Sequence, residues 1–336
     1  MPAASRAAHR LPDAPRAMLV VNPKAGGGRR GAALHQAIGI LVEAGWRIDW
    51  RSTEGPGHAE RLAREAASAG HDLVVAAGGD GTVHEVAQGL AGSNTALALL
   101  PAGTGNVLAG QLGLVRLPTP LNRVDLPAAA RALTTGHVRP IDLGFARSCR
   151  GPGRFFVLWA GIGLDAEVIQ AIETSGRKLK QMLGPAAFGL VGAQTLLTAT
   201  SAHSLVRAGD LRVKGDLLMA LISNVPLYGG SFEIAHAACL DDGRLDTTAF
   251  LSSTPLATLG HLSAVLTGVG DSSALRFDRQ SERVRIVSSR PLAVHLDAEP
   301  FGTTPLAVEV RPAAMQLLVP ATAPRGLFEA EPASAG

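Results

Sequence analysis

The chain has 336 residues, of which 46% are hydrophobic and 18% charged, and its formal net charge is +3. This composition is that of a globular protein, and the length predicts two domains, each large enough to bury its own core. The net charge is small, and no basic stripe interleaved with aromatic residues occurs in the chain, which argues against a nucleic-acid partner.

The cysteines and the terminal segments bear on where the protein works. Cys149 and Cys239 are the only two cysteines, so neither a zinc pattern nor a disulfide framework is present and the cytoplasm is expected. Residues 1–16 lack an apolar core, and we expect them and residues 325–336 to be disordered tails. The longest apolar stretch, residues 182–197, is shorter than the roughly 20 clean residues of a spanning helix.

The first expected strand, residues 17–21, runs into a glycine-rich loop that begins at Asn22 and contains Lys24. A helix is expected over residues 32–44, and a second pair follows as a strand at 46–51 and a helix at 58–69. Lys24 can reach a phosphate as a point charge, although a solvated loop lysine is an equally good interpretation.

The next strand, residues 73–77, leads into Gly78-Gly79-Asp80-Gly81-Thr82 and then a helix at 83–90. Glycines let the backbone approach an anion closely, and the first free N–H groups of a helix point at it. An acidic residue in such a loop fits a nucleotide only if Mg²⁺ lies between Asp80 and the phosphates. A tight turn with a solvated aspartate is the plainer alternative for this loop taken alone.

A third strand, residues 95–100, delivers Gly103-Thr104-Gly105-Asn106 before a helix near 107–112. Strand and helix alternate throughout this region, which predicts a parallel sheet flanked by helices. Loops that follow parallel strands gather at the carboxyl edge of the sheet, where ligands bind. Three such loops in order therefore predict a phosphate-binding edge, with the hydroxyls of Thr82 and Thr104 as donors.

Beyond residue 138 the pattern changes to many short strands separated by turns, which predicts an antiparallel β-sandwich. Helices are expected at 166–181 and at 254–269. The expected strands are 139–145, 155–160, 217–223, 245–250, 283–287, 292–296, 306–310 and 315–319. We therefore expect an α/β domain at 17–137 and a sandwich domain at 138–311.

These motifs resemble, in order, those of the diacylglycerol kinase catalytic family, which includes sphingosine kinases and bacterial lipid kinases. The pieces that match are Asn22–Gly26, Thr53 with Gly57-His58-Ala59, Gly78–Glu85, Gly103–Asn106, Asp242–Asp246 and Asp297–Glu299. The resemblance implies an NAD-kinase- and phosphofructokinase-like α/β domain completed by residues 312–324. It also implies an ATP- and Mg²⁺-dependent phosphotransferase of phospholipid metabolism whose acceptor is diacylglycerol or a related lipid alcohol.

The nucleotide contacts are assigned to the three loops, to the start of the helix after the second loop and to Thr53, although a structural role is the better interpretation of His84 on the sequence. They are Asn22, Lys24, Thr53, Gly78, Gly79, Asp80, Gly81, Thr82, Val83, His84, Gly103 and Thr104. His84 stands where the family usually has asparagine, and Val107 stands where many bacterial members have aspartate next to the acceptor alcohol. The headgroup preference therefore does not carry over, although Asn106 remains a candidate for hydrogen bonding to substrate.

The stretch from His295 to Glu299 reads as the end of a strand, which would place Asp297 and Glu299 on one face. Neighbouring carboxylates raise one another's pKa, which suits proton abstraction, whereas spacing alone favours two solvated carboxylates. The resemblance implies that Glu299 is the general base and that Asp297 lies at the substrate. Ala298 replaces a family glycine, at a cost of about 1 kcal/mol if the position needs a positive φ.

A second metal site is implied by the resemblance, with the Asp242 carboxylate and the carbonyls of Cys239 and Arg244 binding a structural Mg²⁺. The sequence alone favours an Asp-Gly turn there. Residues 175–180 are cationic and precede the apolar stretch, which fits either a lipid entrance with transient contact to the membrane surface or an ordinary core helix.

Two other functions remain open on the sequence. An NAD kinase-like enzyme shares the glycine loop, and a catalytically silent nucleotide- or lipid-binding protein would explain the departures at His84, Val107 and Ala298. The oligomeric state is also open, with a homodimer as one option.

Overall fold

The computed structural model describes residues 8–28, 31–116, 124–149, 151–174, 201–229, 232–251 and 276–329. The chain folds into two compact units. The first contains Met1–Leu143, Cys239–Gly243 and Arg311–Gly336, and the second contains Gly144–Ala238 and Arg244–Val310. The stretches at 175–180 and 182–197 and the helix expected at 254–269 lie outside the described residues.

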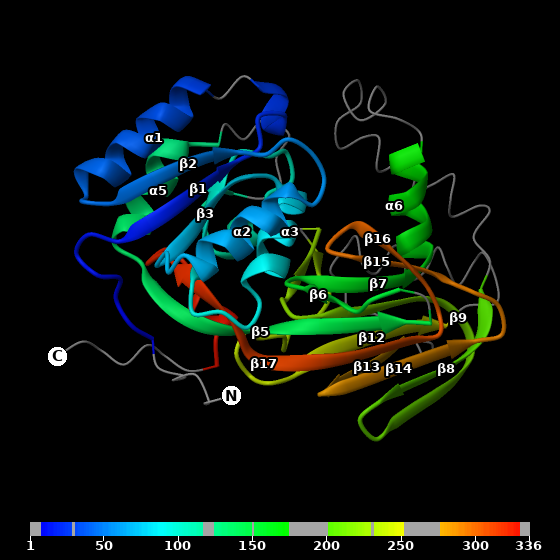
Figure 1. Cartoon of the computed structure of the whole chain (residues 1–336). Helices are drawn as coiled ribbons and strands as arrows, with labels where there is room; N and C mark the ends of the chain where they lie inside the picture. Colours follow the sequence, from blue (N-terminus) through cyan, green and yellow to red (C-terminus); the bar gives the residue numbers. More distant parts are fainter. Residues whose placement is uncertain are drawn as a thin grey trace. The chain divides into compact units, whose positions relative to one another are not determined.

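The first unit is a parallel sheet with helices on both faces (Figure 1), which confirms the predicted α/β architecture. The strands lie in the order β17 (Leu306–Val319), β4 (Ala96–Pro101), β3 (Leu73–Gly78), β1 (Arg16–Val21) and β2 (Arg47–Ser52). The helical segments are η1 (Ala25–Gly28), α1 (Gly31–Glu43), α2 (His58–Ser68), α3 (Asp80–Leu90), α4 (Val107–Gln111), α5 (Leu126–Thr134) and η2 (Arg325–Leu327).

The core of this unit follows from its apolar strands, because β3 and β4 are buried along their whole length. Helices α1 and α5 pack against one face of the sheet through residues such as Leu41 and Leu133. Helices α2 and α3 cover the other face (Figure 1). Burial of both faces explains why the strands read as continuous apolar runs rather than as alternating ones.

The second unit is an antiparallel β-sandwich, as predicted, with one described helix, α6 (Leu164–Thr174). Its strands are β5 (His137–Ser148, shared with the first unit), β6 (Arg154–Phe156), β7 (Trp159–Gly163), β8 (Ala202–Ala208), β9 (Leu211–Ser223), β10 (Leu227–Tyr228), β11 (Phe232–Glu233), β12 (Leu245–Leu251), β13 (Arg276–Ser281), β14 (Arg283–Ser288), β15 (Ala293–Leu296) and β16 (Glu299–Thr303). The sequence did not indicate β8 or β13 as strands.

The strand expected at 155–160 is instead divided into β6 and β7. The break has a physical cause, since the backbone N–H groups of Val157 and Leu158 donate to the carboxylate of Asp297. These two N–H groups are therefore not available for hydrogen bonds to a neighbouring strand.

The two strands expected at 306–310 and 315–319 form the single strand β17, which pairs with β14 near its start and with β4 near its end. Ala313 within it has φ of 51° and donates its N–H to Asp142.

Parts of the two tails that were expected to be disordered are ordered. His9 forms an isolated bridge with Val138, and Leu327 in η2 is buried. In the described part of the chain, no helix has both the length and the apolar character required to span a bilayer.

Candidate active site

The second and third glycine loops of the first unit meet at the carboxyl edge of β3 and β4. The N–H of Gly103 donates to the carbonyl of Gly78 at 2.9 Å. A Cβ added to Gly103 would overlap the Cα of Gly79, and one added to Gly78 would overlap the side chain of Thr82. Glycine is required here for space, because the two loops pack backbone against backbone.

Asp80 is the first residue of α3 and faces the third loop. Its Oδ1 accepts a hydrogen bond from the N–H of Val107 at 2.7 Å, and its Oδ2 lies where a Cβ on Gly105 would project. A carboxylate at a helix N-terminus is favoured by the helix dipole. Asp80 is therefore fixed against the third loop of the first unit and is only partly exposed.

The first loop is joined to the second through Asn22. Its Nδ2 donates to Oγ1 of Thr82 at 3.2 Å, and its Oδ1 accepts from the N–H of Lys24 at 3.0 Å. Thr53 follows β2 and donates its N–H to Val21 at 2.8 Å. All three sequence-derived loops and Thr53 therefore converge on one edge of the parallel sheet.

Asn106, His84 and Thr104 differ in the burial of their side chains and in the hydrogen bonds that these side chains already form. Asn106 is buried, has φ of 54°, and closes its own loop by bonding to both the N–H and the carbonyl of Gly103. His84 is also buried, beside Gln88 on the same helix. Thr104 is exposed. A substrate contact by Asn106 and nucleotide contacts by His84, Val83 and Thr104 stay predictions.

Glu85, which the sequence placed in the glycine motif without a role, anchors the start of α2. Its Oε1 accepts from the N–H of Gly57 at 2.8 Å and its Oε2 from the N–H of Ala59 at 3.0 Å. These are orphan donors at a helix N-terminus, and a carboxylate there satisfies them. Glu85 therefore fixes α2 beside the glycine loop that precedes it.

The loop Cys239–Gly243, with the proposed metal ligands Cys239 and Asp242, is fastened to the first unit by Asp142. The buried Asp142 carboxylate accepts from the N–H groups of Gly243 at 2.6 Å and Ala313 at 2.7 Å. Arg139 pairs with Asp241 at 2.9 Å. Arg244, the third proposed ligand, is the next residue along the chain and belongs to the second unit. No local pattern marks Asp142 as a functional residue, since a lone aspartate in a strand is common.

In the second unit, the segment after β15 is a hairpin turn and not the end of a strand. Asp297 and Ala298 have φ of 50° and 69°, and Glu299 begins β16. Asp297 is buried whereas Glu299 is exposed, so the expectation that both carboxylates share one face is wrong. The position of the family glycine does have a positive φ, so the condition under which alanine is unfavourable is met at Ala298.

The carboxylate of Asp297 is occupied by backbone donors. Oδ2 accepts from Val157 at 2.9 Å, and Oδ1 accepts from Leu158 at 2.8 Å and from Trp159 at 3.1 Å. The N–H of Asp297 in turn donates to the carbonyl of Trp159 at 2.9 Å. These bonds fix the turn on the β6–β7 corner, so Asp297 has a structural task here and its contact with substrate stays a prediction.

Three further side chains lie beneath the turn: the buried Asp165 and His295 and the half-buried Tyr228. His295 Nε2 lies 2.6 Å from Asp165 Oδ2, and its Nδ1 lies 3.1 Å from the N–H of Ala298. The hydroxyl of Tyr228 donates to Asp165 Oδ1. Burial, with the charge of Asp165, raises the pKa of Tyr228 well above its ordinary value. Sequence analysis gave these residues no role, because each alone resembles an ordinary polar core residue.

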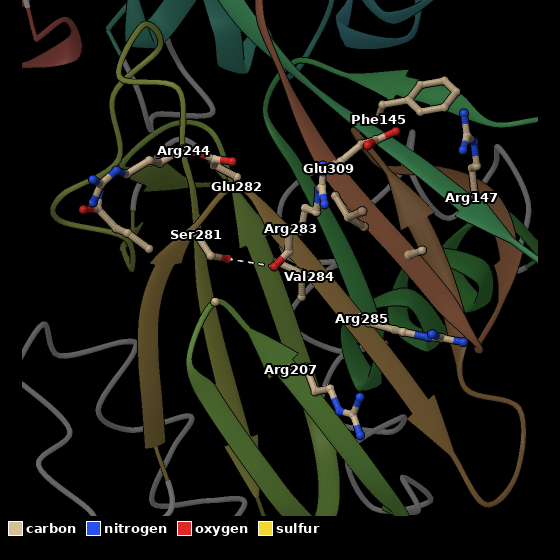
Figure 2. A pocket seen from close by; sticks show the side chains of 14 residues that line it. Phe145, Arg147, Arg207, Arg244, Ser281, Glu282, Arg283, Val284, Arg285 and Glu309 are labelled. Carbon is tan, nitrogen blue, oxygen red and sulfur yellow. Dashed lines mark hydrogen bonds between the residues drawn. The ribbon is translucent and has the colours of Figure 1, made fainter.

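An open pocket of about 800 Å³ also lies in the second unit (Figure 2). Arg207, Arg283 and Arg285 line it from β8 and β14, and Glu282 and Glu309 are its acidic residues. Of the predicted site residues only Arg244 reaches this pocket. It is therefore a basic surface feature separate from the turn that carries Glu299.

Comparison with known proteins places both units in one family. The profile of the diacylglycerol kinase catalytic domain matches residues 16–146, and that of the YegS C-terminal NAD kinase beta sandwich-like domain matches residues 159–319. A probable lipid kinase YegS-like protein of Pseudomonas putida is 34% identical over 293 residues, covering 87% of this chain and 92% of that protein.

Two further relatives extend the comparison. A diacylglycerol kinase of Bacillus subtilis is 28% identical over 292 residues, which cover 86% of this chain and 91% of that protein. The crystal structure of a putative diacylglycerol kinase from Bacillus anthracis shares the fold with a TM-score of 0.74 at 24% identity, covering 92% of this chain and 98% of that one. With its fold, its glycine loops and these relatives, the chain belongs to the diacylglycerol kinase family of lipid kinases.

Proposed function

We propose that the chain transfers the γ-phosphate of ATP to a hydroxyl of diacylglycerol or a related lipid alcohol. The observation that carries the proposal is the meeting of three loops at one sheet edge, where Gly78, Gly79 and Gly103 let the second and third loops pack backbone against backbone. Loops of this kind expose backbone N–H groups to phosphate oxygens. Membership in the lipid kinase family supports the acceptor class.

The nucleotide would lie across these loops. The N–H groups at the start of α3, the exposed hydroxyl of Thr104 and the exposed ammonium of Lys24 would be donors to phosphate oxygens. The hydroxyl of Thr82 is buried beside them. Asn22 would hold the first and second loops in register through its bond to Thr82. Phosphoryl transfer depends mainly on such positioning and on charge neutralisation.

Asp80 fits a Mg²⁺ ion bound together with the phosphates, because carboxylate oxygens are preferred ligands and Asp80 is held at the helix N-terminus. When bound, the ion would neutralise charge on the phosphates. A second Mg²⁺ is proposed at Asp242 with the carbonyls of Cys239 and Arg244. An Asp242→Asn variant that melts at the same temperature with and without Mg²⁺, beside a parent that Mg²⁺ stabilises, would support this second ion.

Glu299 is the proposed general base. It would take the proton of the lipid hydroxyl, whose oxygen then forms a bond to the γ-phosphorus while the bond to the bridging oxygen of ADP breaks. An exposed carboxylate at the start of β16, following a fixed turn, suits this task. The acceptor hydroxyl must therefore reach both Glu299 and the γ-phosphate during transfer.

The test is transfer of labelled γ-phosphate to diacylglycerol, monoacylglycerol, sphingosine, ceramide and polyprenol, with Glu299→Gln beside the parent. We expect Glu299→Gln to lower turnover about 10²- to 10⁴-fold, the usual contribution of a general base, with nucleotide affinity unchanged. Turnover retained in this variant would contradict the assignment.

NAD kinase activity is the second candidate, since the sandwich profile carries an NAD kinase-like description. Adding NAD as an acceptor in the same assay separates the two functions. Nucleotide binding without transfer to any acceptor would favour a silent binding protein.

We also propose transient contact with anionic membranes through the basic face of the second unit. Arg207 on β8 lies directly opposite Arg212 on β9 and Arg285 on β14, and all three are exposed. Like charges opposed across strands repel one another, and an anionic surface relieves this repulsion. Each arginine near such a surface contributes about 1 kcal/mol.

Vesicle sedimentation tests this contact. The triple variant Arg207→Gln, Arg212→Gln and Arg285→Gln should bind phosphatidylglycerol-containing vesicles much more weakly than the parent. A control with Arg10, Arg47 and Arg61 changed to Gln removes the same charge from exposed positions of the first unit. Equal loss in both variants would show that net charge alone is responsible.

A further inference from the structure

The turn that precedes Glu299 rests on a series of three side chains, the buried His295 and Asp165 and the half-buried Tyr228. Tyr228 bonds to Asp165, Asp165 to His295, and His295 to the backbone N–H of Ala298. We infer that this series positions the base, with His295 fixing the peptide that leads into Glu299. The inference rests on the proposed role of Glu299.

The hydrogen bonds determine the protonation of His295. A backbone N–H can only donate, so Nδ1 must accept from Ala298. The ring proton therefore lies on Nε2 and is donated to Asp165 Oδ2 at 2.6 Å. The opposite tautomer, or a doubly protonated ring, would set an N–H against the N–H of Ala298. Asp165 thus selects the one form of His295 that can hold the turn.

Tyr228, at the other end of the series from the turn, is also held in place. The hydroxyl of Tyr228 donates to Asp165 Oδ1, and its raised pKa keeps it a neutral donor. The ring of Trp159 packs on that of Tyr228 with centroids 5.1 Å apart. A Cβ on Gly161 would overlap both Asp165 and His295, so only a residue without a side chain leaves room for this pair.

The turn needs this support because its two residues are in the left-handed region without being glycine. Such a conformation is unfavourable for residues with a Cβ and persists only when its surroundings impose it. Asp297 is held by its carboxylate at the β6–β7 corner, and the backbone of Ala298 is held by His295. Loss of the hydrogen bond between His295 and the N–H of Ala298 would let the Ala298–Glu299 peptide shift, and this shift would displace the carboxylate of Glu299.

Two substitutions of His295 separate positioning from mere structural support. The amide oxygen of asparagine lies near the position of Nδ1 and can still accept from Ala298, whereas the amide of glutamine reaches the position of Nε2 and can still bond Asp165. Each variant thus loses one buried hydrogen bond. Thermal melting should show similar losses of stability for His295→Asn and His295→Gln.

Turnover should differ between the two. We expect kcat to fall about 10- to 100-fold in His295→Gln, as for a base misplaced by about 1 Å, and to stay close to the parent in His295→Asn. KM for ATP should be unchanged in both. Equal kcat in the two variants, or a lower kcat in His295→Asn, would overturn the inference.

Tyr228→Phe supplies a test with a smaller change should the histidine variants fail to fold. Removal of the hydroxyl leaves His295 in place but frees one oxygen of Asp165. We expect a severalfold lower kcat with KM for ATP unchanged, and an unchanged kcat would argue against the series. Glu299→Gln is measured alongside. If Glu299→Gln retains turnover, the proposed base itself is wrong, and that result differs from every outcome for His295 and Tyr228.

Discussion

The glycine loops of the first unit and the turn before Glu299 in the second present opposite backbone problems. Gly78 and Gly103 do not have φ in the left-handed region, and they are glycine because a side chain would overlap Thr82 or Gly79. Asp297 and Ala298 do have left-handed φ and are not glycine. A position where a side chain would overlap its neighbours is recognised in the sequence because it holds glycine. A left-handed conformation that distant side chains impose on other residues is not recognised in this way.

The largest effect in this comparison is expected from Asp297→Ala. It would leave three backbone N–H groups, those of Val157, Leu158 and Trp159, without their acceptor. Since each buried unsatisfied donor costs about 1–3 kcal/mol, we expect the free energy of unfolding to fall by about 3 kcal/mol or more. Urea unfolding measures this loss. A loss below about 1 kcal/mol would mean that water readily replaces the carboxylate.

Much of the first unit could be predicted because its signals are local. Apolar runs followed by glycine loops and helices define β1, β3 and β4, and the loops meet because parallel strands share a carboxyl edge. Asp80 and Gly103 therefore lie near each other, as the order of motifs indicated. The start of α3 differs, since it begins at Asp80 instead of residue 83, and helix α5 was not expected from the sequence.

The turn of the second unit could not be predicted, because its causes are far apart in the sequence. Asp-Ala is not the Asn-Gly or Asp-Gly pair that marks a tight hairpin, and the stretch from His295 to Glu299 reads as the end of a strand. The acceptor for the N–H of Val157 is 140 residues away, and Asp165 is 130 residues from His295. No local pattern records such pairs.

Gly103→Ala tests the other side of the comparison. The new methyl group would overlap Gly79, so the two loops must separate, and overpacking of this kind costs about 1–3 kcal/mol. We expect weaker nucleotide binding together with a lower free energy of unfolding. Gly39→Ala in α1 is the matched control, since nothing lies within 4 Å of its Cβ position, and it should be neutral or slightly stabilising. Normal nucleotide affinity in Gly103→Ala would indicate that these loops do not bind phosphate.

Tyr228 gives the support of the turn a pH dependence. A pKa raised above the ordinary value of 10.0 means that the folded state favours the neutral phenol. The stability from this group is fully present below pH 10 and is lost as pH rises through the raised pKa. Tyr228→Phe should therefore cost about 1–2 kcal/mol below pH 10 and progressively less above it.

Because the chain has a single tyrosine, ultraviolet absorbance of tyrosinate reports on Tyr228 alone. In denaturant we expect ionisation near the ordinary pKa. In the native protein we expect no tyrosinate until the pH is well higher or the protein unfolds. Identical titrations in the two states would show that the phenol is accessible to solvent and does not donate to Asp165.

The smallest effect is expected from Ala298→Gly, which relieves the turn without removing a hydrogen bond. Glycine removes the roughly 1–2 kcal/mol cost of left-handed φ, but it also raises the entropy of the unfolded chain. The net gain in unfolding free energy should be about 0.5–1 kcal/mol, with turnover close to that of the parent. Ala293→Gly in β15 is the control and should lose about the same amount, since its strand conformation needs no glycine. A loss in both variants would show that the surroundings of Ala298, and not its φ, set the energy of this turn.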